Sequence, residues 1–500
     1  MGKSVIIAGA GIAGLSAGYY AQINGYRVSI FEMNSAAGGL CTAYKRMGYT
    51  WDLSMHNLNN SKRGPLYRMW KELGVLDENK FHYHSEMMRV ESGEKRLSFG
   101  VDKNKLQEAM LAISPQDSEA IKKYIDLIFG RSMMSAASLK PGILQNPIDK
   151  LKIFLAVVPL LPMLVKYGNL TMREYAGFFK DPFLQNAARF VIDSPGWPML
   201  RCPVAGAAGF IRSSVVEAGV PIGGSQKVVH GIAERFCKSG GEIFYKSPVS
   251  ELIIENDRVC GVKLQNGTGH RADIVIWAAD GHHLIFDMLK EKYINEQIRK
   301  MYTTWTPVLP MVQVMIGVNR DMSSEPHRIL IELDNPLQIA DEDHKWISVK
   351  HHCFDPTAAP PGKSAVEVWY ATNYEYWENL LKDRKKYEEE KNRIARITIA
   401  ELDKRWPGFA NQVEVVDVPT PMTYNRYTGN WRGSPDGWYV TPDNMRITEM
   451  IRSLPGLEGL YTIGQWTAPF MGTIMSALSG RQIVELICKG DRKKFVTVKK

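Results

Sequence analysis

The chain has 500 residues, of which 45% are hydrophobic and 23% are charged, and its formal net charge is +9. This length and apolar content suffice for two or three domains with large cores, and they exclude a disordered chain. The six cysteines include no C-x-x-C pair, so the sequence predicts neither a disulfide framework nor a metal site. Scattered cysteines of this kind indicate a cytoplasmic protein.

The excess positive charge is spread along the chain, with short basic runs at residues 492–494 and 499–500. No zinc-finger or RNA-recognition motif accompanies it, so we expect no nucleic-acid partner. A basic surface is attracted to anionic lipid, which makes peripheral contact with the inner face of the cell membrane one expectation. A solvated surface without membrane contact is the alternative.

The first forty residues predict a strand, a glycine-rich turn, a helix and a second strand. The strands are the apolar runs at residues 4–8 and 27–31, and the helix lies between them at residues 15–23. This order, with a G-x-G-x-x-G turn after the first strand, is the dinucleotide-binding unit of the Rossmann fold. The sequence therefore predicts a nucleotide cofactor on an α/β domain.

The residues of this unit have separate physical roles. Gly9 makes the tight turn, Gly11 lets the backbone approach a pyrophosphate, and Gly14 lets the helix pack closely on the strand. The first turn of the helix directs its free N–H groups at the phosphates. Glu32, after the second strand, is placed to accept hydrogen bonds from both ribose hydroxyls, and its charge would repel a 2′-phosphate.

A second motif follows the acidic residue. Gly38 and Gly39 form a glycine pair, and residues 48–56 read G-Y-x-x-D-x-x-x-H. The two together resemble the second flavin-binding signature of the flavoprotein superfamily that includes amine oxidases. Their form is most similar to the branch of phytoene desaturases, carotenoid isomerases and retinol saturases. The resemblance implies that the nucleotide is FAD.

Two later segments extend the resemblance. Residues 221–280 carry the P-x-G-G and A-D-x-V-I-x-A blocks of that branch, and Val249 matches its adenine-contacting position. Residues 454–481 match the last flavin segment, in which a strand ending at Gly464 meets the ribityl chain and the next helix directs its N–H groups at the flavin. The residues that the resemblance assigns to FAD binding are Gly9, Gly11, Ile12, Ala13, Gly14, Glu32, Met33, Gly38, Gly39, Leu40, Val249, Ala279, Gly464, Gln465, Gly472, Thr473 and Ile474.

The flavin segments are far apart in the chain. The resemblance therefore implies a Rossmann-like, discontinuous FAD-binding domain of the glutathione-reductase type with an inserted α+β substrate domain. The FAD-binding domain is expected at residues 1–80, 215–300 and 430–500. The substrate-binding domain is expected at residues 81–214 and 301–429.

The remaining stretches divide into helical and extended patterns. A hairpin is predicted within residues 82–99, and helices are predicted from residue 102 to about 190. One long helix is expected at residues 376–406, and residues 421–434 resemble a family loop between the substrate cavity and the flavin. A closing helix is expected from Ser476 onward. The strands expected in the second half are residues 312–318, 346–350, 365–372 and 413–418.

Residues 153–165 are apolar on all sides and contain two prolines. The run is shorter than the ~20 residues that a membrane-spanning helix needs, so we expect no span. Three alternatives stay open: a buried helix of the substrate domain, a wall of an apolar substrate tunnel, and a shallow membrane-dipping element. The resemblance favours the last two, because the related enzymes take long isoprenoids from a membrane. The apolar helical region around residues 150–190 is thus a candidate membrane contact.

Five side chains are candidates for the substrate pocket. His56, Tyr424 and Arg426 are the candidate catalytic residues, since such groups polarise a substrate or transfer a proton. Trp431 and Trp466 offer flat surfaces on which a polyene can stack. A structural role is the alternative for His56, and ordinary packing is the alternative for the aromatic side chains.

The resemblance implies an FAD-dependent desaturase or saturase that transfers hydride between the flavin and a carbon–carbon bond of an apolar, isoprenoid or carotenoid-like substrate. A polyene isomerase without net electron transfer is the second hypothesis, and an amine-oxidase-like flavoprotein is the third. The sequence has no second G-x-G-x-x-G unit, so a dedicated nicotinamide domain is not expected. The electron donor or acceptor stays open between a quinone, oxygen, ferredoxin and NAD(P)H.

Overall fold

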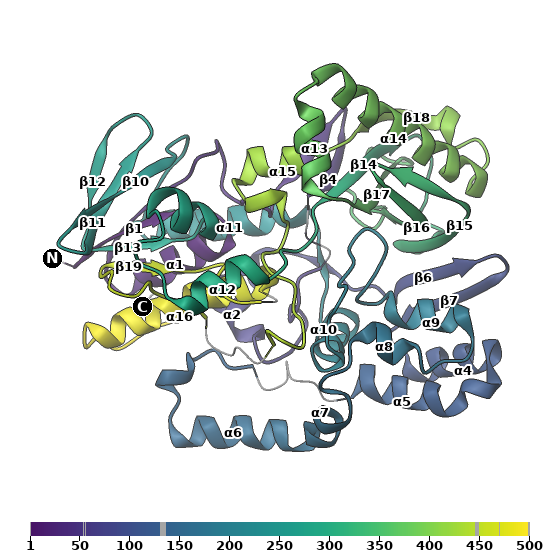
Figure 1. Ribbon diagram of the computed structural model, residues 1–500, viewed down its shortest axis with the longest axis horizontal. Coiled ribbons are helices and arrows are strands. Elements are labelled where there is room, and N and C mark those ends of the chain that lie inside the picture. The colour runs from purple at the N-terminus through teal and green to yellow at the C-terminus, as the bar shows by residue number, and fades with distance from the viewer. Residues whose placement is uncertain are drawn as a thin grey trace.

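Two large sheets organise the protein, and each draws its strands from segments far apart in the chain. Figure 1 shows them in separate lobes, with both termini and the first sheet on the left and the second sheet at the upper right. The computed structural model describes residues 2–53, 55, 57–130, 137–445, 450–469 and 471–498.

The first sheet contains the predicted strand–helix–strand unit. β1 (Ser4–Ala8) pairs in parallel with β2 (Arg27–Phe31) on one side and with β13 (Ile274–Trp277) on the other. β9 (Glu242–Phe244) and β19 (Leu460–Thr462) extend the two edges, also in parallel. Parallel α/β sheets bind ligands beyond the carboxyl ends of their strands, which is where the glycine turn after β1 lies.

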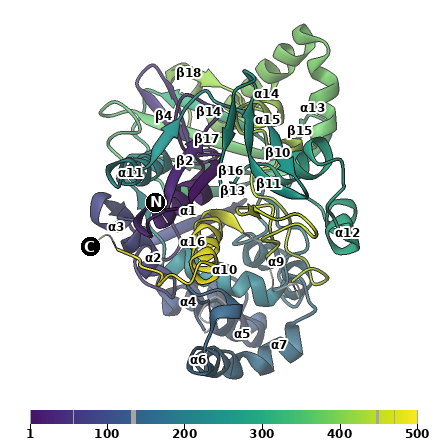
Figure 2. The same cartoon turned by 90° about the vertical axis from the view of Figure 1, so that its left-hand side faces the viewer.

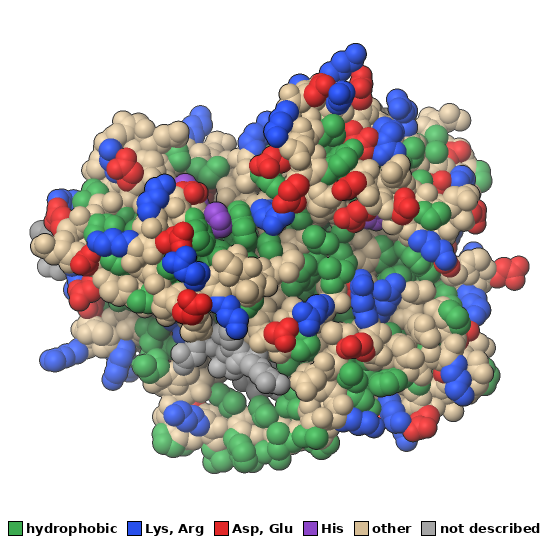
Figure 3. All heavy atoms as spheres, viewed as in Figure 1, with side chains coloured by type: hydrophobic (Ala, Val, Ile, Leu, Met, Phe, Trp, Pro, Cys, Tyr) green, Lys and Arg blue, Asp and Glu red, His purple; other side chains and the backbone are tan. Residues whose placement is uncertain are grey.

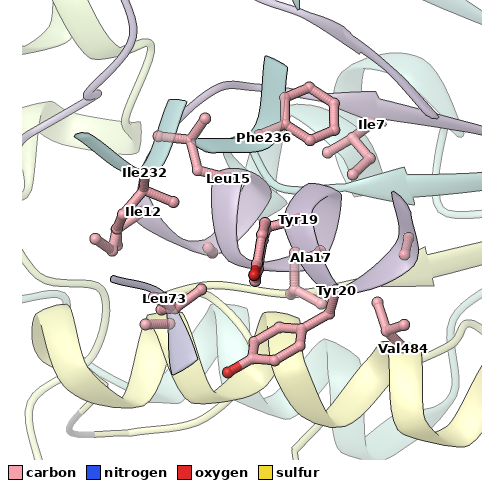
Figure 4. Close-up of a cluster of buried hydrophobic side chains, with 14 of the residues drawn as sticks. Ile7, Ile12, Leu15, Ala17, Tyr19, Tyr20, Leu73, Ile232, Phe236 and Val484 are labelled. Carbon is pink, nitrogen blue, oxygen red and sulfur yellow. The ribbon is translucent and has the colours of Figure 1, made fainter. Parts of the chain in front are cut away.

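Three helices pack together against this sheet. α1 (Ile12–Ile23) contacts β1 and β2, and α11 (Gly224–Lys238) and α16 (Gly472–Gly490) pack on α1. Figure 4 shows Phe236 of α11 and Val484 of α16 among the buried side chains that surround α1. Every residue of α1 from 12 to 21 is buried, which explains why its sequence lacks an amphipathic pattern.

Two glycines permit the close packing of α1. A Cβ atom at Gly14 would lie 2.0 Å from the carbonyl oxygen of Gly9, and one at Gly480 would lie 2.4 Å from that of Ala13. Both distances are far inside van der Waals contact, so neither position accommodates a larger residue without movement of the backbone. This is the packing role that the glycine motif predicts for Gly14.

Smaller sheets flank the first one. An antiparallel sheet of three strands follows α11 and packs its apolar face on β1 and β13. Two further small sheets have two strands each: β3 pairs with β4, and β5 pairs with β8. The bounds are β3 (Ala43–Arg46), β4 (Tyr49–Asp52), β5 (Phe81–His82), β8 (Val220–Pro221), β10 (Val249–Glu255), β11 (Arg258–Leu264) and β12 (Gly269–Arg271).

The second sheet has seven strands in the order β18-β14-β17-β16-β15-β6-β7. Its neighbours are antiparallel except for β15 and β6, which run in parallel with Leu330 opposite Val90. β14 and β17 are buried along their whole length, as expected for central strands covered on both faces. The bounds are β6 (Glu86–Ser92), β7 (Lys95–Gly100), β14 (Met311–Val318), β15 (Arg328–Ile339), β16 (Glu342–His351), β17 (Ser364–Ala371) and β18 (Val413–Asp417).

The strand predictions omit β15, and its sequence explains the omission. Asp334, Asn335 and Pro336 in its middle are typical of a turn. In the structure they form an irregular step, where the pairing of β15 with β16 shifts between Glu332 and Leu337. The sheet tolerates this bulge because the flanking residues resume the ladder.

A group of helices covers one face of the second sheet and extends below it in Figure 2. Their apolar faces share a core with β6, β7 and β15. Of the shorter helices, α2 and α3 pack in the core around α1, and α12 packs in the core beside β13. The bounds are α2 (Tyr67–Glu72), α3 (Val75–Glu78), α4 (Lys103–Ile113), α5 (Ser118–Phe129), α8 (Met172–Ala176), α9 (Pro182–Arg189), α10 (Val204–Val216) and α12 (Glu296–Thr304).

The long helix predicted at residues 376–406 is two helices, α13 (Tyr374–Leu381) and α14 (Arg384–Arg405). Asp383 separates them, because its side chain accepts a hydrogen bond of 3.2 Å from the backbone N–H of Lys386. This side-chain cap satisfies a free donor at the start of α14 and favours a new helix over continuation of the old one. The prediction of one continuous helix is therefore wrong here.

The loop predicted at residues 421–434 begins with a helix, α15 (Pro421–Thr428). Pro421 occupies the first helical position, where its missing N–H costs nothing. Gly429, with φ of 68°, ends the helix in the left-handed conformation that glycine adopts freely. The prediction of an irregular loop is wrong for these eight residues.

The apolar run at residues 153–165 forms the end of α6 (Pro147–Val157), a tight turn (Val158–Leu160) and the start of α7 (Leu161–Tyr167). Neither α6 nor α7 has a buried residue, and within the run only Leu160 is buried among the residues described. The buried-helix alternative is therefore wrong. No helix of the described chain is long and apolar enough to cross a membrane.

The exposed side chains of α6 and α7 form an apolar face. Phe154 is 61% exposed and Val165 is 87% exposed, whereas core side chains of the same types are almost fully buried. Figure 3 shows hydrophobic atoms gathered along the lower edge of the molecule, where α6 lies in Figure 1. We define the apolar face as Ile148, Leu151, Phe154, Leu155, Leu161 and Val165.

Candidate functional site

A cavity of about 710 Å³ has walls from both large sheets. One part of its wall, the cofactor side, consists of the glycine turn after β1, the end of β13 and the N-terminus of α16. The other part, the substrate side, consists of the start of β15, the end of β16 and the inward-facing side of α10. A molecule bound on one side therefore lies in the same cavity as a molecule bound on the other.

The residues predicted to bind FAD lie together on the cofactor side. Every one of them lines the cavity except Gly14, which packs α1 on β1 instead. A Cβ atom at Gly11 would have no atom within 4 Å, so the backbone there faces open space. That opening is what the predicted approach of a pyrophosphate requires.

Glu32 anchors the cofactor side through its carboxylate, which is only 4% exposed. Its Oε2 accepts a hydrogen bond of 2.8 Å from the N–H of Ala10, and its Oε1 accepts bonds from the backbone N–H of Asn34 at 2.8 Å and from Asn34 Nδ2 at 3.0 Å. A carboxylate has about four acceptor positions, so these donors leave room for about one ribose hydroxyl. Contact with both hydroxyls requires the Asn34 amide to turn away.

Two helix N-termini meet on the cofactor side. α1 begins after Gly11, and α16 begins at Gly472, four residues before the predicted Ser476. Both present free N–H groups and the positive end of a helix dipole to the cavity, where they stabilise phosphate or a negatively charged ring.

Asp436 lies beside the N-terminus of α16 and lines the cavity, and the sequence motifs give no signal for it. Its Oδ1 accepts a hydrogen bond of 2.9 Å from the N–H of Gly472. Burial raises the pKa of Asp436 to about 7, although this hydrogen bond acts in the opposite direction. Asp436 is therefore a carboxyl group that can hold or release a proton near neutral pH.

Unpartnered polar atoms on the cofactor side test whether FAD fits. Gln465 Nε2 and Trp466 Nε1 are buried and have no hydrogen-bond partner within the described ranges, and both residues line the cavity. Buried donors in folded proteins are almost always satisfied, so these two are available to acceptors of a ligand in the cavity. With the open space at Gly11, they fit a ligand that combines phosphates, hydroxyls and a polar ring, as FAD does.

The predicted pocket aromatics are part of a larger cluster. Trp431 stacks on His282 with 4.5 Å between ring centroids, and Trp466 meets Trp438 edge to face at 5.1 Å. Trp431 and Trp466 both line the cavity. They are thus wall residues and packing residues at once, so the two alternatives considered from the sequence do not exclude each other.

Two of the candidate catalytic residues, Tyr424 and Arg426, lie outside the cavity wall. His56 lies outside the described residues. Tyr424 is 1% exposed, and its hydroxyl donates a hydrogen bond of 3.0 Å to the carbonyl of Leu53. Arg426 is exposed on α15, and its guanidinium lies 4.8 Å from the ring centroid of Tyr427. Neither side chain is part of the cavity wall, so the geometry gives Tyr424 and Arg426 structural contacts, and their catalytic roles stay predictions.

Asp52, the aspartate of the second motif, ties β4 to α11. Its carboxylate accepts a hydrogen bond of 2.9 Å from the N–H of Ser225 and a second one from the Ser225 hydroxyl. Burial raises the pKa of Asp52 to about 6, while the bonds from Ser225 oppose the rise.

The substrate side combines an apolar wall with a few polar groups. The polar groups include His84, His327, Arg328 and Lys350, none of which belongs to a recognised motif. The sequence gives no signal for these groups beyond the position of Lys350 at the end of the strand predicted at residues 346–350. The apolar wall residues are Met87, Val191, Ile192, Trp197, Met199, Phe210 and Val215.

The βαβ unit, the paired helix N-termini and the unpartnered donors define an FAD-dependent oxidoreductase. Residues 12–488 match the family model described as flavin containing amine oxidoreductase, so the chain belongs to that family. The resemblance indicated by the glycine motifs, the α/β fold class and FAD as the cofactor are thereby confirmed.

Relatives and solved structures agree with this membership. The chain is 24% identical over 506 residues to the chloroplastic prolycopene isomerase of Daucus carota, with 95% of this chain and 78% of the relative covered. It is 25% identical over 397 residues to a 4,4'-diapophytoene desaturase (4,4'-diapolycopene-forming) of Methylomonas, with 73% and 72% covered. A crystal structure of an oxidoreductase from Methanosarcina mazei superposes with a TM-score of 0.62 at 18% identity, covering 96% of this chain and 100% of that one, and shows the same fold.

Proposed function

We propose that the protein desaturates or saturates a carbon–carbon bond of an apolar isoprenoid or polyene. The observation that carries this proposal is a shared cavity, in which the predicted FAD-binding residues face an apolar wall from the second lobe. Bound FAD supplies hydride exchange at the flavin N5 atom. The apolar wall positions a greasy chain and keeps water away from the reacting bond.

Asp436 is a group of this chain suited to the proton of the reaction. Adding or removing two hydrogens at a carbon–carbon bond moves one hydride and one proton. A group that transfers a proton works best when its pKa lies near the working pH, and the pKa of Asp436 is raised to about 7 by burial. Its hydrogen bond from Gly472 fixes the carboxyl at the cavity wall.

Isomerisation of a polyene without net electron transfer is the second candidate, supported by the similarity to a prolycopene isomerase. An amine substrate is the third, and the cavity disfavours it. Amines are bound as cations, whereas the substrate side presents Arg328 and Lys350. The partner that exchanges electrons with the flavin stays open between a quinone, oxygen, ferredoxin and NAD(P)H.

The test is mass spectrometry of an isoprenoid and lipid extract incubated with the purified flavoprotein, once with oxidised and once with pre-reduced flavin. A species whose mass changes by two hydrogens supports the proposal, and the flavin state that produces it gives the direction. A change in retention at constant mass means isomerisation instead. Conversion of amines alone would assign the protein to the third class.

We propose further that the apolar face of α6 and α7 contacts an anionic membrane surface. Six large apolar side chains of these two helices are exposed, and such gathered apolar surface marks an interaction site. Lys150, Lys152 and Lys166 lie exposed in the same two helices, so the face combines greasy side chains with positive charge. That combination fits the boundary between lipid headgroups and acyl chains. The protein would then act at the inner face of the cell membrane.

Replacement of Phe154, Leu155 and Val165 by serine tests this contact by flotation with phosphatidylglycerol vesicles. Each side chain contributes about 1 kcal/mol or more when it is buried in lipid, so binding should weaken on the order of hundredfold. A variant with serine at Met47 and Val498, which are 73% and 58% exposed outside these helices, is the matched control and should float as the wild type does. Equal flotation of both variants would contradict the proposal.

A further inference from the structure

Two cations face the cavity from neighbouring strands of the second sheet. Arg328 is the first residue of β15 and pairs directly with Lys350 of β16, so both side chains lie on the same face of the sheet. Both line the substrate side of the cavity. A pure hydrocarbon bound there would leave two charged groups against apolar atoms, which is unfavourable.

Lys350 already has an anionic partner. Its Nζ lies 3.7 Å from Glu367 Oε1 and 3.7 Å from the ring centroid of Trp369. The same carboxylate accepts a hydrogen bond of 2.9 Å from Trp369 Nε1 and lies 3.2 Å from His352 Nε2. Glu367 is therefore fully engaged within its own cluster, and the charge of Lys350 is matched.

Among the described residues, Arg328 donates hydrogen bonds to neutral side chains only. Its Nη2 donates a hydrogen bond of 2.6 Å to Ser194 Oγ, and its Nε donates one of 3.3 Å to Ser348 Oγ. Among the carboxylates of the described residues, none forms an ion pair with Arg328. Burial lowers the pKa of Arg328 to about 10, with Glu367 opposing the change, and the group stays a cation at neutral pH. An enclosed cation without an anion is costly unless a ligand supplies one.

A second polar position points to the same ligand. His84 Nε2 is buried without a hydrogen-bond partner in the described part of the chain, and the His84 ring stacks on His327 with centroids 4.4 Å apart. Both histidines line the cavity next to Arg328 in the wall. Burial lowers the pKa of His84 to about 3, so the ring is neutral and can contribute a hydrogen bond but no charge.

We infer that the substrate carries a terminal carboxylate, which forms an ion pair with Arg328 and a hydrogen bond with His84. This inference rests on the proposed function and narrows its substrate class to isoprenoid or polyene acids. The planar guanidinium matches a carboxylate with two parallel hydrogen bonds. Arg328 forms no ion pair with a described carboxylate, and a carboxylate of the substrate would supply the negative charge that pairs with it. The apolar wall then holds the chain that extends from it toward the cofactor side.

The test measures equilibrium binding to the FAD-loaded protein by quenching of tryptophan fluorescence, since Trp197 lines the substrate side. The probes are retinoic acid and methyl retinoate, which share one polyene and differ in charge. We expect the acid to bind at least about tenfold more tightly, the difference that a charge-assisted hydrogen bond of about 1.4 kcal/mol produces. Equal affinity of acid and ester would overturn the inference without requiring any variant.

Variants test whether Arg328 causes the preference for the acid over the ester. Arg328→Gln should bring the acid to the affinity of the ester, Arg328→Lys should keep part of the preference, and Arg96→Gln, an exposed arginine on β7 of the same sheet, should behave as wild type. A preference that survives in Arg328→Gln would overturn the inference. Binding and turnover separate the two proposals: turnover of neutral polyenes with no acid preference removes only the inference, whereas acid preference without conversion of any polyene removes only the proposed reaction.

Discussion

The two sides of the cavity recognise their ligands by different means. The cofactor side is built largely from backbone: open space at Gly11, two helix N-termini and glycines where a side chain would intrude. The substrate side is built from side chains that converge from separate strands, such as Arg328 and Lys350. Backbone recognition requires glycine at fixed spacing, whereas side-chain recognition leaves no spacing rule. The cofactor is thus recognised through backbone geometry, and the substrate through the chemistry of individual side chains.

The largest effect is expected where the backbone geometry itself is broken. Gly14→Ala places a Cβ atom 2.0 Å from the carbonyl oxygen of Gly9, so α1 must move away from β1. We expect a loss of about 3 kcal/mol or more in the free energy of unfolding, measured by denaturant titration. Gly11→Ala is the matched control, because its Cβ points into the open cavity. It should keep the stability of the FAD-free protein and lose FAD instead, and equal destabilisation by both changes would contradict the comparison.

A smaller effect is expected from Glu32, the buried carboxylate that anchors the cofactor side. Glu32→Ala removes the acceptor for Ala10 and Asn34 and the contact with the ribose. Since hydrogen bonds to a charged group contribute about 1.5–3 kcal/mol, FAD affinity should fall by about tenfold to hundredfold. The measurement is the FAD content of the purified variant by absorbance. Glu242→Ala, at an exposed position on the adjacent β9, should retain full occupancy. Full FAD occupancy of the Glu32→Ala variant would show that FAD binding does not depend on Glu32.

A pH-dependent effect is expected from the carboxyl group beside the flavin site. Burial raises the pKa of Asp436 from 3.8 to about 7, so the folded protein keeps a proton that the unfolded chain releases. Stability from this group is present at low pH and is lost as pH rises from about 4 to about 7. Asp436→Asn removes a titrating group while keeping an acceptor for Gly472. Both proteins are compared without FAD. The free energy of unfolding of the wild type should fall relative to that of the variant as the pH rises over that range. A difference independent of pH would show that Asp436 is ionised throughout.

The sequence predicts the cofactor side better than the substrate side for a physical reason. β1 and β2 have the predicted bounds, because a glycine turn between short apolar runs allows few alternatives. Asp436 carries no such signal: its raised pKa comes from burial and from α16, whose N-terminus lies far away in the chain. Arg328 is equally silent, because β15 looks like a turn at Asp334–Pro336 and the cavity it faces forms only when the strands assemble.

The apolar run of α6 and α7 shows that composition alone does not predict whether a segment is buried. A stretch that is apolar on all sides is compatible with burial and with exposure to lipid, and the sequence left both open. The structure decides against burial, since Leu161 and Val165 are exposed while Leu160 alone turns inward. The boundaries of the two predicted domains stay a prediction, although the strands of each sheet come from alternating parts of the chain.

The parallel pairing of β6 with β15 has a consequence for biosynthesis. Val90 leaves the ribosome long before its partner Leu330, and at the usual rate of elongation β6 waits on the order of ten to fifty seconds for β15. β1 waits similarly for β13, since Val5 pairs with Ile274. Neither lobe can close its sheet while the nascent chain is short, so both expose unpaired strand edges during synthesis. Such a topology folds slowly after release and makes truncated chains prone to aggregate, which favours a chaperone during production of the protein.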